Sequence, residues 1–172
     1  PLDWLLDHSL SKNGMDTLFI AMLLNSDEKA VGKLLKHPRS NIALSDAGAH
    51  LTFFNDAGYG LYMLQKWVRE NKLMSIEEAI YNLTGKQADI YRIDQRGRLV
   101  PGQHADMMLL DPEEVSVSQS YRVNDLPGGG SRLNIDGQGI KGVWVNGQRV
   151  LEDGDLINKT DFPGKVIRGF HA

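Results

Sequence analysis

The chain has 172 residues, a formal net charge of −3 and no cysteine. Without cysteine, neither a disulfide bond nor a thiolate metal ligand is available, so any metal ion would need histidine and carboxylate ligands. The slightly acidic charge, with no basic stretch that alternates with aromatic residues, argues against a nucleic-acid partner. No apolar run approaches the roughly 20 residues that cross a bilayer, so we expect no membrane segment. The N-terminus has neither a signal-like start nor a methionine, so we expect a cytoplasmic protein and a fragment or processed chain.

The first part of the chain alternates helix-like and strand-like patterns. Leucines recur at helical spacing over residues 2–10, and residues 17–24 form a continuous apolar run of strand length. Such a run is typical of a strand that is buried on both faces, as in a parallel sheet. A helix capped by Ser26 follows, and then a second short apolar strand at residues 41–44. This β-α-β order predicts parallel strands joined by a crossover helix.

Two further helices are expected after this unit. The apolar face of the first consists of Leu61, Leu64 and Val68. In the second, Ser75 and Glu78 form a capping box, and Gly85 is placed to end the helix. The apolar face of this second helix consists of Ile76, Ala79, Ile80 and Leu83, which recur at helical spacing.

From residue 93 onward the helical periodicity disappears and turn residues recur. Asn146-Gly147 between two apolar stretches is a strong hairpin signal, because both residues accept the positive φ angles of a type I′ turn. We therefore predict two domains, an α/β domain over residues 1–92 and a small antiparallel β-sandwich over residues 93–172.

Two glycine patterns invite a phosphate-binding interpretation. Gly137, Gly139 and Gly142 fit the spacing G-x-G-x-x-G, but that motif must open a helix, whereas here it runs into a hairpin strand. We interpret these residues as turn glycines. Gly128–Gly130 could cradle an anion, but no Lys-Ser or Lys-Thr pair and no helix start follows it. A flexible surface loop is therefore the favoured interpretation.

Asp46 is the strongest candidate for chemistry. It lies in the stretch Ser45-Asp46-Ala47-Gly48-Ala49-His50, directly after a predicted buried strand, and parallel folds place ligands and catalysis at that end of a strand. A carboxylate there is costly unless it is hydrogen-bonded, caps a helix or holds a metal. The residues alone leave open a functional carboxylate and a structural Asp that caps a turn. The histidines that show no metal-ligand spacing are His8, His37, His104 and His171.

Residues 41–50 resemble the eighth barrel strand of the amidohydrolase superfamily, and more specifically of its N-acyl-D-amino-acid deacylase branch. The block Gly-Arg-Leu-x-Pro-Gly followed by Ala-Asp, at residues 97–106, marks the superfamily generally. Ser-Asp-Ala-Gly-Ala-His together with Leu-Pro-x-Gly-Gly, at residues 126–130, is more specific to this branch. The resemblance covers nearly the whole chain. Its other parts are Trp67-Val68-Arg69-Glu70, Ser75–Ala79, Val145-Asn146-Gly147 and Pro163–Arg168.

The resemblance implies the last two βα units of a TIM-like (β/α)₈ barrel, with strands at Leu18–Leu24 and Ile42–Leu44, followed by the β-sandwich. It implies that the parent protein is a zinc-dependent hydrolase of the linear amide bond in N-acyl-D-amino acids. Asp46 would then contact the metal and shuttle a proton, and His50 would line the pocket of this small-molecule substrate. The remaining N-terminal part of the barrel would be the partner that supplies the other metal ligands.

Two departures from the family pattern matter. The His-x-His motif and the later metal ligands are absent, and because a catalytic zinc needs about three protein ligands, we expect this chain alone to be inactive. Residues 50–58 also lack the arginine with which some D-aminoacylases grip the substrate carboxylate. Another amidohydrolase chemistry, such as that of a cyclic amidase, therefore stays open. A third hypothesis is a stand-alone, non-catalytic β-sandwich module in which Asp46 is a structural cap.

Overall fold

The structure, a computed structural model, describes residues 1–11, 17, 19, 24–42, 44–157, 160 and 162–168. The chain divides into two compact units, Pro1–Leu34 and Leu35–Ala172. The strand predicted at Leu18–Leu24 lies outside the described residues except for Phe19 and Leu24, so it stays a prediction. None of the helices in the described ranges is both long and apolar enough to cross a membrane.

The helices of the first unit are α1 (Leu2–Ser11) and most of α2 (Glu28–Lys36). In α1 the ring of Trp4 stacks on that of His8 one turn later, with the centroids 5.1 Å apart. α2 is capped by Asp27, whose Oδ1 accepts hydrogen bonds from two following backbone N–H groups at 2.9 and 3.1 Å. The cap is therefore one residue after the predicted Ser26, because Asp27 directly precedes the first helical residue, Glu28.

The described helices of the second unit are α3 (Tyr59–Tyr62), η2 (Met63–Glu70), α4 (Ile76–Leu83), α5 (Gly85–Tyr91) and the short 3₁₀ helix η3 (Pro127–Gly129). α3 runs directly into η2, which is a π-helix. At its end the N–H of Asn71 donates to the carbonyl of Lys66, five residues earlier, at 2.9 Å. The apolar face predicted for this segment is confirmed at Leu64, of which only 2% is exposed.

α4 begins where its sequence predicts. Ser75 is the N-cap, and its Oγ accepts a hydrogen bond from the N–H of Glu78 at 3.2 Å. The predicted apolar face is confirmed at Ala79, which is fully buried. The prediction that α4 stops at Gly85 is confirmed, because the helix ends at Leu83 with Thr84 as its C-cap. A second helix, α5, then begins at Gly85 itself. A Cβ added to Gly85 would lie 2.9 Å from Cδ2 of Tyr81, so the glycine serves a close approach between the two helices.

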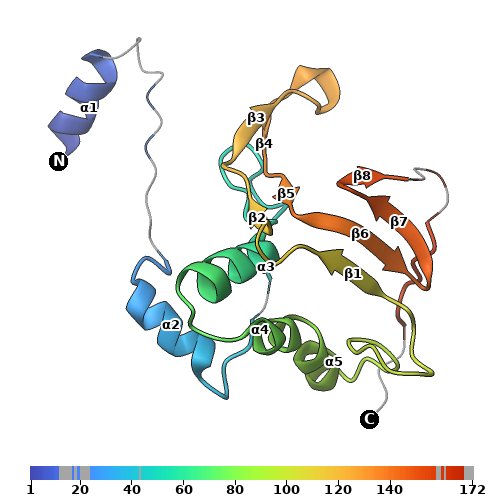
Figure 1. Cartoon of the computed structure of the whole chain (residues 1–172). Coiled ribbons are helices and arrows are strands. Elements are labelled where there is room, and N and C mark those ends of the chain that lie inside the picture. Colours follow the sequence, from blue (N-terminus) through green and yellow to red (C-terminus); the bar gives the residue numbers. More distant parts are fainter. Residues whose placement is uncertain are drawn as a thin grey trace. The chain divides into compact units, whose positions relative to one another are not determined.

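The strands of the second unit form antiparallel sheets (Figure 1). The largest sheet has the order β1-β6-β7-β8, and two smaller sheets pair β2 with β5 and β3 with β4. The bounds are β1 (Met107–Leu110), β2 (Ser116–Val117), β3 (Tyr121–Val123), β4 (Arg132–Asn134), β5 (Gly137–Gln138), β6 (Ile140–Val145), β7 (Gln148–Glu152) and β8 (Asp155–Leu156). Antiparallel pairing after residue 93 is thus confirmed, and the sandwich arrangement stays a prediction.

The hairpin predicted around Asn146-Gly147 is confirmed. Val145 pairs with Gln148 across the turn, and the two turn residues have φ angles of 49° and 79°, the signs that a type I′ turn requires.

The prediction that the G-x-G-x-x-G spacing runs into a strand rather than a helix is confirmed, whereas of its three glycines only Gly139 lies between strands. Gly137 lies in β5 and Gly142 in β6, so the motif opens no helix. Between them Gly139 has a φ of +74°, and a Cβ there would lie 2.5 Å from the backbone nitrogen of Val115. Only glycine therefore fits at this crossing of two backbones.

Helices and strands of the second unit pack together. The guanidinium of Arg69 on η2 donates to the carbonyl of Val115 at 2.7 Å and to that of Pro112 at 3.1 Å. The side chain of Val115 is only 1% exposed. The domain boundary predicted between residues 92 and 93 falls inside this unit and stays a prediction.

Candidate functional site

Asp46 lies in an exposed turn rather than at the end of a buried strand. Neither Ile42 nor Leu44 is in a strand, and 77% of Leu44 is exposed, so the prediction of a buried strand at Ile42–Leu44 is wrong for the described residues. A parallel strand needs a neighbouring strand, and nothing in the described part of the chain pairs with this segment.

The turn itself is built from short-range hydrogen bonds. Asp46 has a left-handed φ of 55°. Its carbonyl accepts from the N–H of Ala49 at 3.3 Å, and Oγ of Ser45 accepts from the N–H of Ala47 at 3.1 Å. Within the described residues no hydrogen bond or ion pair holds the carboxylate of Asp46 itself. That carboxylate is exposed and available to a ligand.

His50 begins the next turn of the same loop. It also has a left-handed φ, of 54°, and its ring stacks on Phe53 with the centroids 5.0 Å apart. Its carbonyl accepts from the N–H groups of Phe53 and Phe54 at 3.0 and 3.1 Å. Nothing in the described ranges hydrogen-bonds His50 to Asp46, so the structure places the two predicted site residues on one loop without joining their side chains. The roles predicted for Asp46 and His50 stay predictions.

The loop that follows Asp46 is fastened to strand β4 through one residue, Leu133. The N–H of Leu133 donates to the carbonyl of Leu51 at 2.8 Å. Its carbonyl accepts from Nδ2 of Asn55 at 3.1 Å. Oδ1 of Asn55 in turn accepts from the N–H of Ala57 at 3.1 Å. The contacts with Leu133 were not predicted from the sequence, because they join residues far apart in the chain, 78 positions in the case of Asn55.

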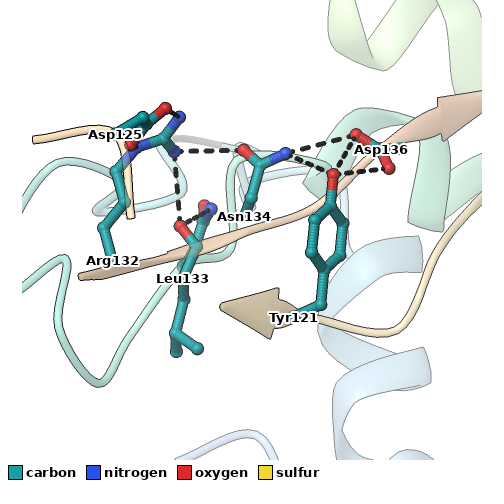
Figure 2. Close-up of polar contacts among 7 residues, drawn as sticks. Tyr121, Asp125, Arg132, Leu133, Asn134 and Asp136 are labelled. Carbon is teal, nitrogen blue, oxygen red and sulfur yellow. Dashed lines mark hydrogen bonds and ion pairs between the residues drawn. The ribbon is translucent and has the colours of Figure 1, made fainter. Parts of the chain in front are cut away.

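Figure 2 shows the polar network on the β3–β4 hairpin that carries Leu133. Arg132 grips Asp125 with two parallel hydrogen bonds, at 2.8 Å from Nε and 2.7 Å from a terminal nitrogen. The hydrogen bond from Arg132 lowers the pKa of the Asp125 carboxyl. At the other end of the network, the hydroxyl of Tyr121 donates to Asp136 at 2.8 Å. Because these groups are largely exposed, we assign the network to the shape of the hairpin rather than to chemistry.

The residues described do not fit a zinc site. Zinc in proteins is held by about three or four nitrogen, oxygen or sulfur ligands at close range. No group of three or more histidine, cysteine or carboxylate residues comes together anywhere in the described part of the chain. Within the described residues Asp46 is therefore a solitary donor.

A shallow apolar pocket of about 410 Å³ lies between α3, α4 and the sheets. Its lining does not include Asp46 or His50. Sequence reasoning missed it, because its lining residues come from segments that are far apart in the chain. The lining residues are Ala57, Gly58, Tyr59, Gly60, Leu61, Leu64, Ile80, Leu83, Thr84, Met108, Ile135 and Gly137.

Comparison with known proteins gives a match over most of the chain. The profile of the amidohydrolase family matches residues 2–151. The N-acyl-D-aspartate deacylase of Alcaligenes xylosoxydans xylosoxydans is 32% identical over 143 residues, which is 82% of this chain and 26% of that enzyme. A dihydroorotase of Lactobacillus gasseri is 29% identical over 92 residues, which is 54% of this chain and 20% of that enzyme. The chain thus spans about a quarter of the length of the first of these curated relatives.

Among solved structures, the N-acyl-D-glutamate deacylase from Bordetella bronchiseptica, complexed with zinc and a phosphonate inhibitor, is similar to part of the chain. The TM-score is 0.42 and the sequence identity is 31%, over 55% of this chain and 19% of that chain.

Proposed function

Because this chain belongs to the amidohydrolase family, we propose that it forms part of a hydrolase that cleaves the linear amide bond of N-acyl-D-amino acids. The observation that carries the proposal is the 32% identity to N-acyl-D-aspartate deacylase over 82% of the chain. Since the chain spans 26% of that relative, the activity would belong to a longer protein that contains these residues.

In this proposal Asp46 is the catalytic carboxylate. A positioned carboxylate can take a proton during attack on the amide carbonyl and return it to the leaving amine. The exposed turn supports this role, because neither burial nor a competing hydrogen bond within the described residues withholds the carboxylate from a substrate. His50, four residues later on the same loop, would line the pocket.

Zinc is the cofactor that the family resemblance implies, and Asp46 would be one of its ligands. The donors found in the described residues do not fit a zinc site by themselves. The other ligands would therefore come from the rest of the longer protein. That part would also provide strands beside Ile42 and Leu44, which have no strand partner among the described residues.

Hydrolysis of a cyclic amide is the second candidate, and the similarity to dihydroorotase favours it. Dihydroorotate is a ring-closed amide, whereas N-acyl amino acids are open chains. A purified full-length protein tested on N-acetyl-D-aspartate, N-acetyl-D-glutamate, N-acetyl-D-leucine and dihydroorotate separates the two. Turnover of dihydroorotate alone would overturn the deacylase proposal, and turnover of none of the four would favour the non-catalytic module.

The role of Asp46 is tested in the same protein by Asp46→Asn. We expect turnover to fall by roughly 10²–10⁴, the usual worth of a positioned acid or base, while the folded, metal-loaded state survives, because Asn keeps the shape and hydrogen-bonding capacity of Asp. The matched control is Asp56→Asn, which removes the same charge from an exposed position of the same loop and should leave turnover within about twofold. Unchanged turnover in a folded Asp46→Asn protein would remove Asp46 from the mechanism.

A further inference from the structure

The loop that carries Asp46 and His50 has little apolar anchoring of its own. Phe53 is 68% exposed, and Ala47 and Gly48 are exposed as well. Three residues of the loop, Asp46, Gly48 and His50, have left-handed φ angles. Such a backbone keeps one conformation only when contacts outside it hold it in place.

Those contacts converge on the peptide groups of Leu133. Leu133 lies opposite Arg122 in the β3–β4 pair, yet its N–H and carbonyl are bonded to Leu51 and Asn55. Residues opposite one another in an antiparallel pair alternate between positions that exchange hydrogen bonds and positions whose groups point outward. Leu133 is in an outward-pointing position, so the loop takes the place of a further strand at the outer edge of β4.

The Asn55 contact differs from the other side-chain bonds of the loop. Its Nδ2 bond to Leu133 is partly buried, whereas the bonds within the loop, from Ala47 to Ser45 and from Ala57 to Asn55, are exposed. A hydrogen bond that is shielded from water is costlier to leave unmade. Arg132 reinforces the same acceptor, because its guanidinium reaches the Leu133 carbonyl at 3.4 Å while it grips Asp125.

Two consecutive turns pass this restraint to Asp46. The N–H of Ala49 is bonded to the Asp46 carbonyl, and the N–H of Phe53 to the His50 carbonyl. Leu51 lies inside the second turn and is bonded to Leu133. We propose that Asn55 is a positioning residue, which holds the Asp46–His50 loop against β4 through Leu133 and so sets where the Asp46 carboxylate meets the substrate. This proposal rests on the deacylase function proposed above.

The informative variant is Asn55→Asp. It keeps the Oδ1 acceptor for the N–H of Ala57 but replaces the donor that faces the Leu133 carbonyl with a second acceptor. The control is Asn124→Asp, which makes the same change at an exposed residue of the β3–β4 hairpin. Asn55→Ala is the second variant, in case the carboxylate of Asn55→Asp prevents folding.

The first measurement is amide hydrogen exchange on the 172-residue chain. We expect the Leu133 amide to exchange at least about tenfold faster in Asn55→Asp and Asn55→Ala than in the wild type and in Asn124→Asp, because its bond to Leu51 opens more often. Unchanged exchange at Leu133 in both Asn55 variants would overturn the attachment itself.

The second measurement is the kinetics of the full-length protein on its best N-acetyl-D-amino acid. We expect kcat to fall by about 10- to 100-fold in the Asn55 variants, the usual effect of misplacing a reacting group by about 1 Å. KM should stay near that of Asn124→Asp, and kcat is expressed per folded molecule, so that loss of stability alone does not produce this pattern. Wild-type turnover with an unchanged kcat in the Asn55 variants would overturn the positioning role alone. A wild-type protein without turnover on any N-acyl-D-amino acid would overturn the proposed function, and the positioning role with it.

Discussion

The backbone N–H of Asn146 donates to Oδ1 of Asp106 at 2.8 Å, so that one carboxylate holds the turn of the β6–β7 hairpin. Its other oxygen is paired with Arg96, whose guanidinium also donates to Oδ1 of Asn146 at 3.0 Å. Beside this contact the N–H of Gly147 donates to the carbonyl of Ala105 at 2.9 Å. The segment before β1 is thus bound to the hairpin tip by side chain and backbone together.

Asp106→Ala should lower the free energy of unfolding by about 1–3 kcal/mol, because it leaves the Asn146 N–H and the Arg96 guanidinium without their partner. The control is Glu113→Ala, which removes an exposed carboxylate and should change stability by less than about 0.5 kcal/mol. Urea denaturation of both variants beside the wild type measures the difference. Equal stabilities for Asp106→Ala and Glu113→Ala would contradict this role.

Because of the same carboxylate, the free energy of unfolding should depend on pH in the acidic range. Partial burial acts to raise the pKa of Asp106, but the hydrogen bond from Asn146 and the pair with Arg96 outweigh it and hold the pKa below its ordinary value. A carboxyl group whose pKa is depressed in the folded state stabilises it fully above the unfolded pKa of about 3.9, and this contribution is lost as the pH falls through the folded pKa. The stability gap between the wild type and Asp106→Ala should therefore be constant near neutral pH and shrink below about pH 4. Denaturation curves from pH 7 to pH 2.5 measure it, and a gap that does not change would refute the assignment.

Gly147→Ala should destabilise the hairpin through its backbone alone. The φ of Gly147 is +79°, yet an added Cβ would lie 3.8 Å from Cβ of Ala105, an ordinary contact. A left-handed conformation costs a residue with a Cβ about 1–2 kcal/mol, and we expect that loss of stability. Gly164→Ala is the matched control, because it has open space and no positive φ. Thermal unfolding of the two variants should separate them by several degrees, with Gly147→Ala the less stable.

The 172-residue chain should not bind zinc tightly. The described residues bring no three suitable donors together, and one or two ligands give far lower affinity than a complete site. Titration calorimetry at pH 7 with zinc chloride is the measurement. Tight binding at one ion per chain would contradict this prediction.

Features encoded within a few residues were predictable from the sequence. The Asn146-Gly147 hairpin and the Ser75 cap of α4 depend on local backbone preferences, and these can be predicted from the residue types alone. The apolar spacing also identified Leu64 and Ala79 as buried. In each case the stabilising contact lies within one turn or one face of an element.

Features that depend on distant partners were not predictable. Gly85 follows the C-cap of α4 as predicted, but the sequence did not indicate that the Tyr81 ring across the helix junction leaves no room for a Cβ there. Residues 41–44 have the apolar content of a strand, yet a strand forms only against another strand. The attachment of the Asp46 loop likewise depends on Leu133, whose place beside Asn55 nothing in the local sequence signals. Asp46 could be selected as a candidate from the few residues around it. The contacts that hold its loop against β4 could be found only in the structure.

The π-helix from Met63 to Glu70 bears on how the length of this sequence can change over evolutionary time. Each π-turn holds one residue more than an α-turn, so the loss of one residue there would return the segment to regular α-helix rather than break it. The buried side chains of Leu64 and Trp67 lie on this segment, which follows α3 directly and ends at its C-cap Asn71. We expect relatives one residue shorter at this place to keep the same core, and single-residue deletions to be tolerated better here than in α4.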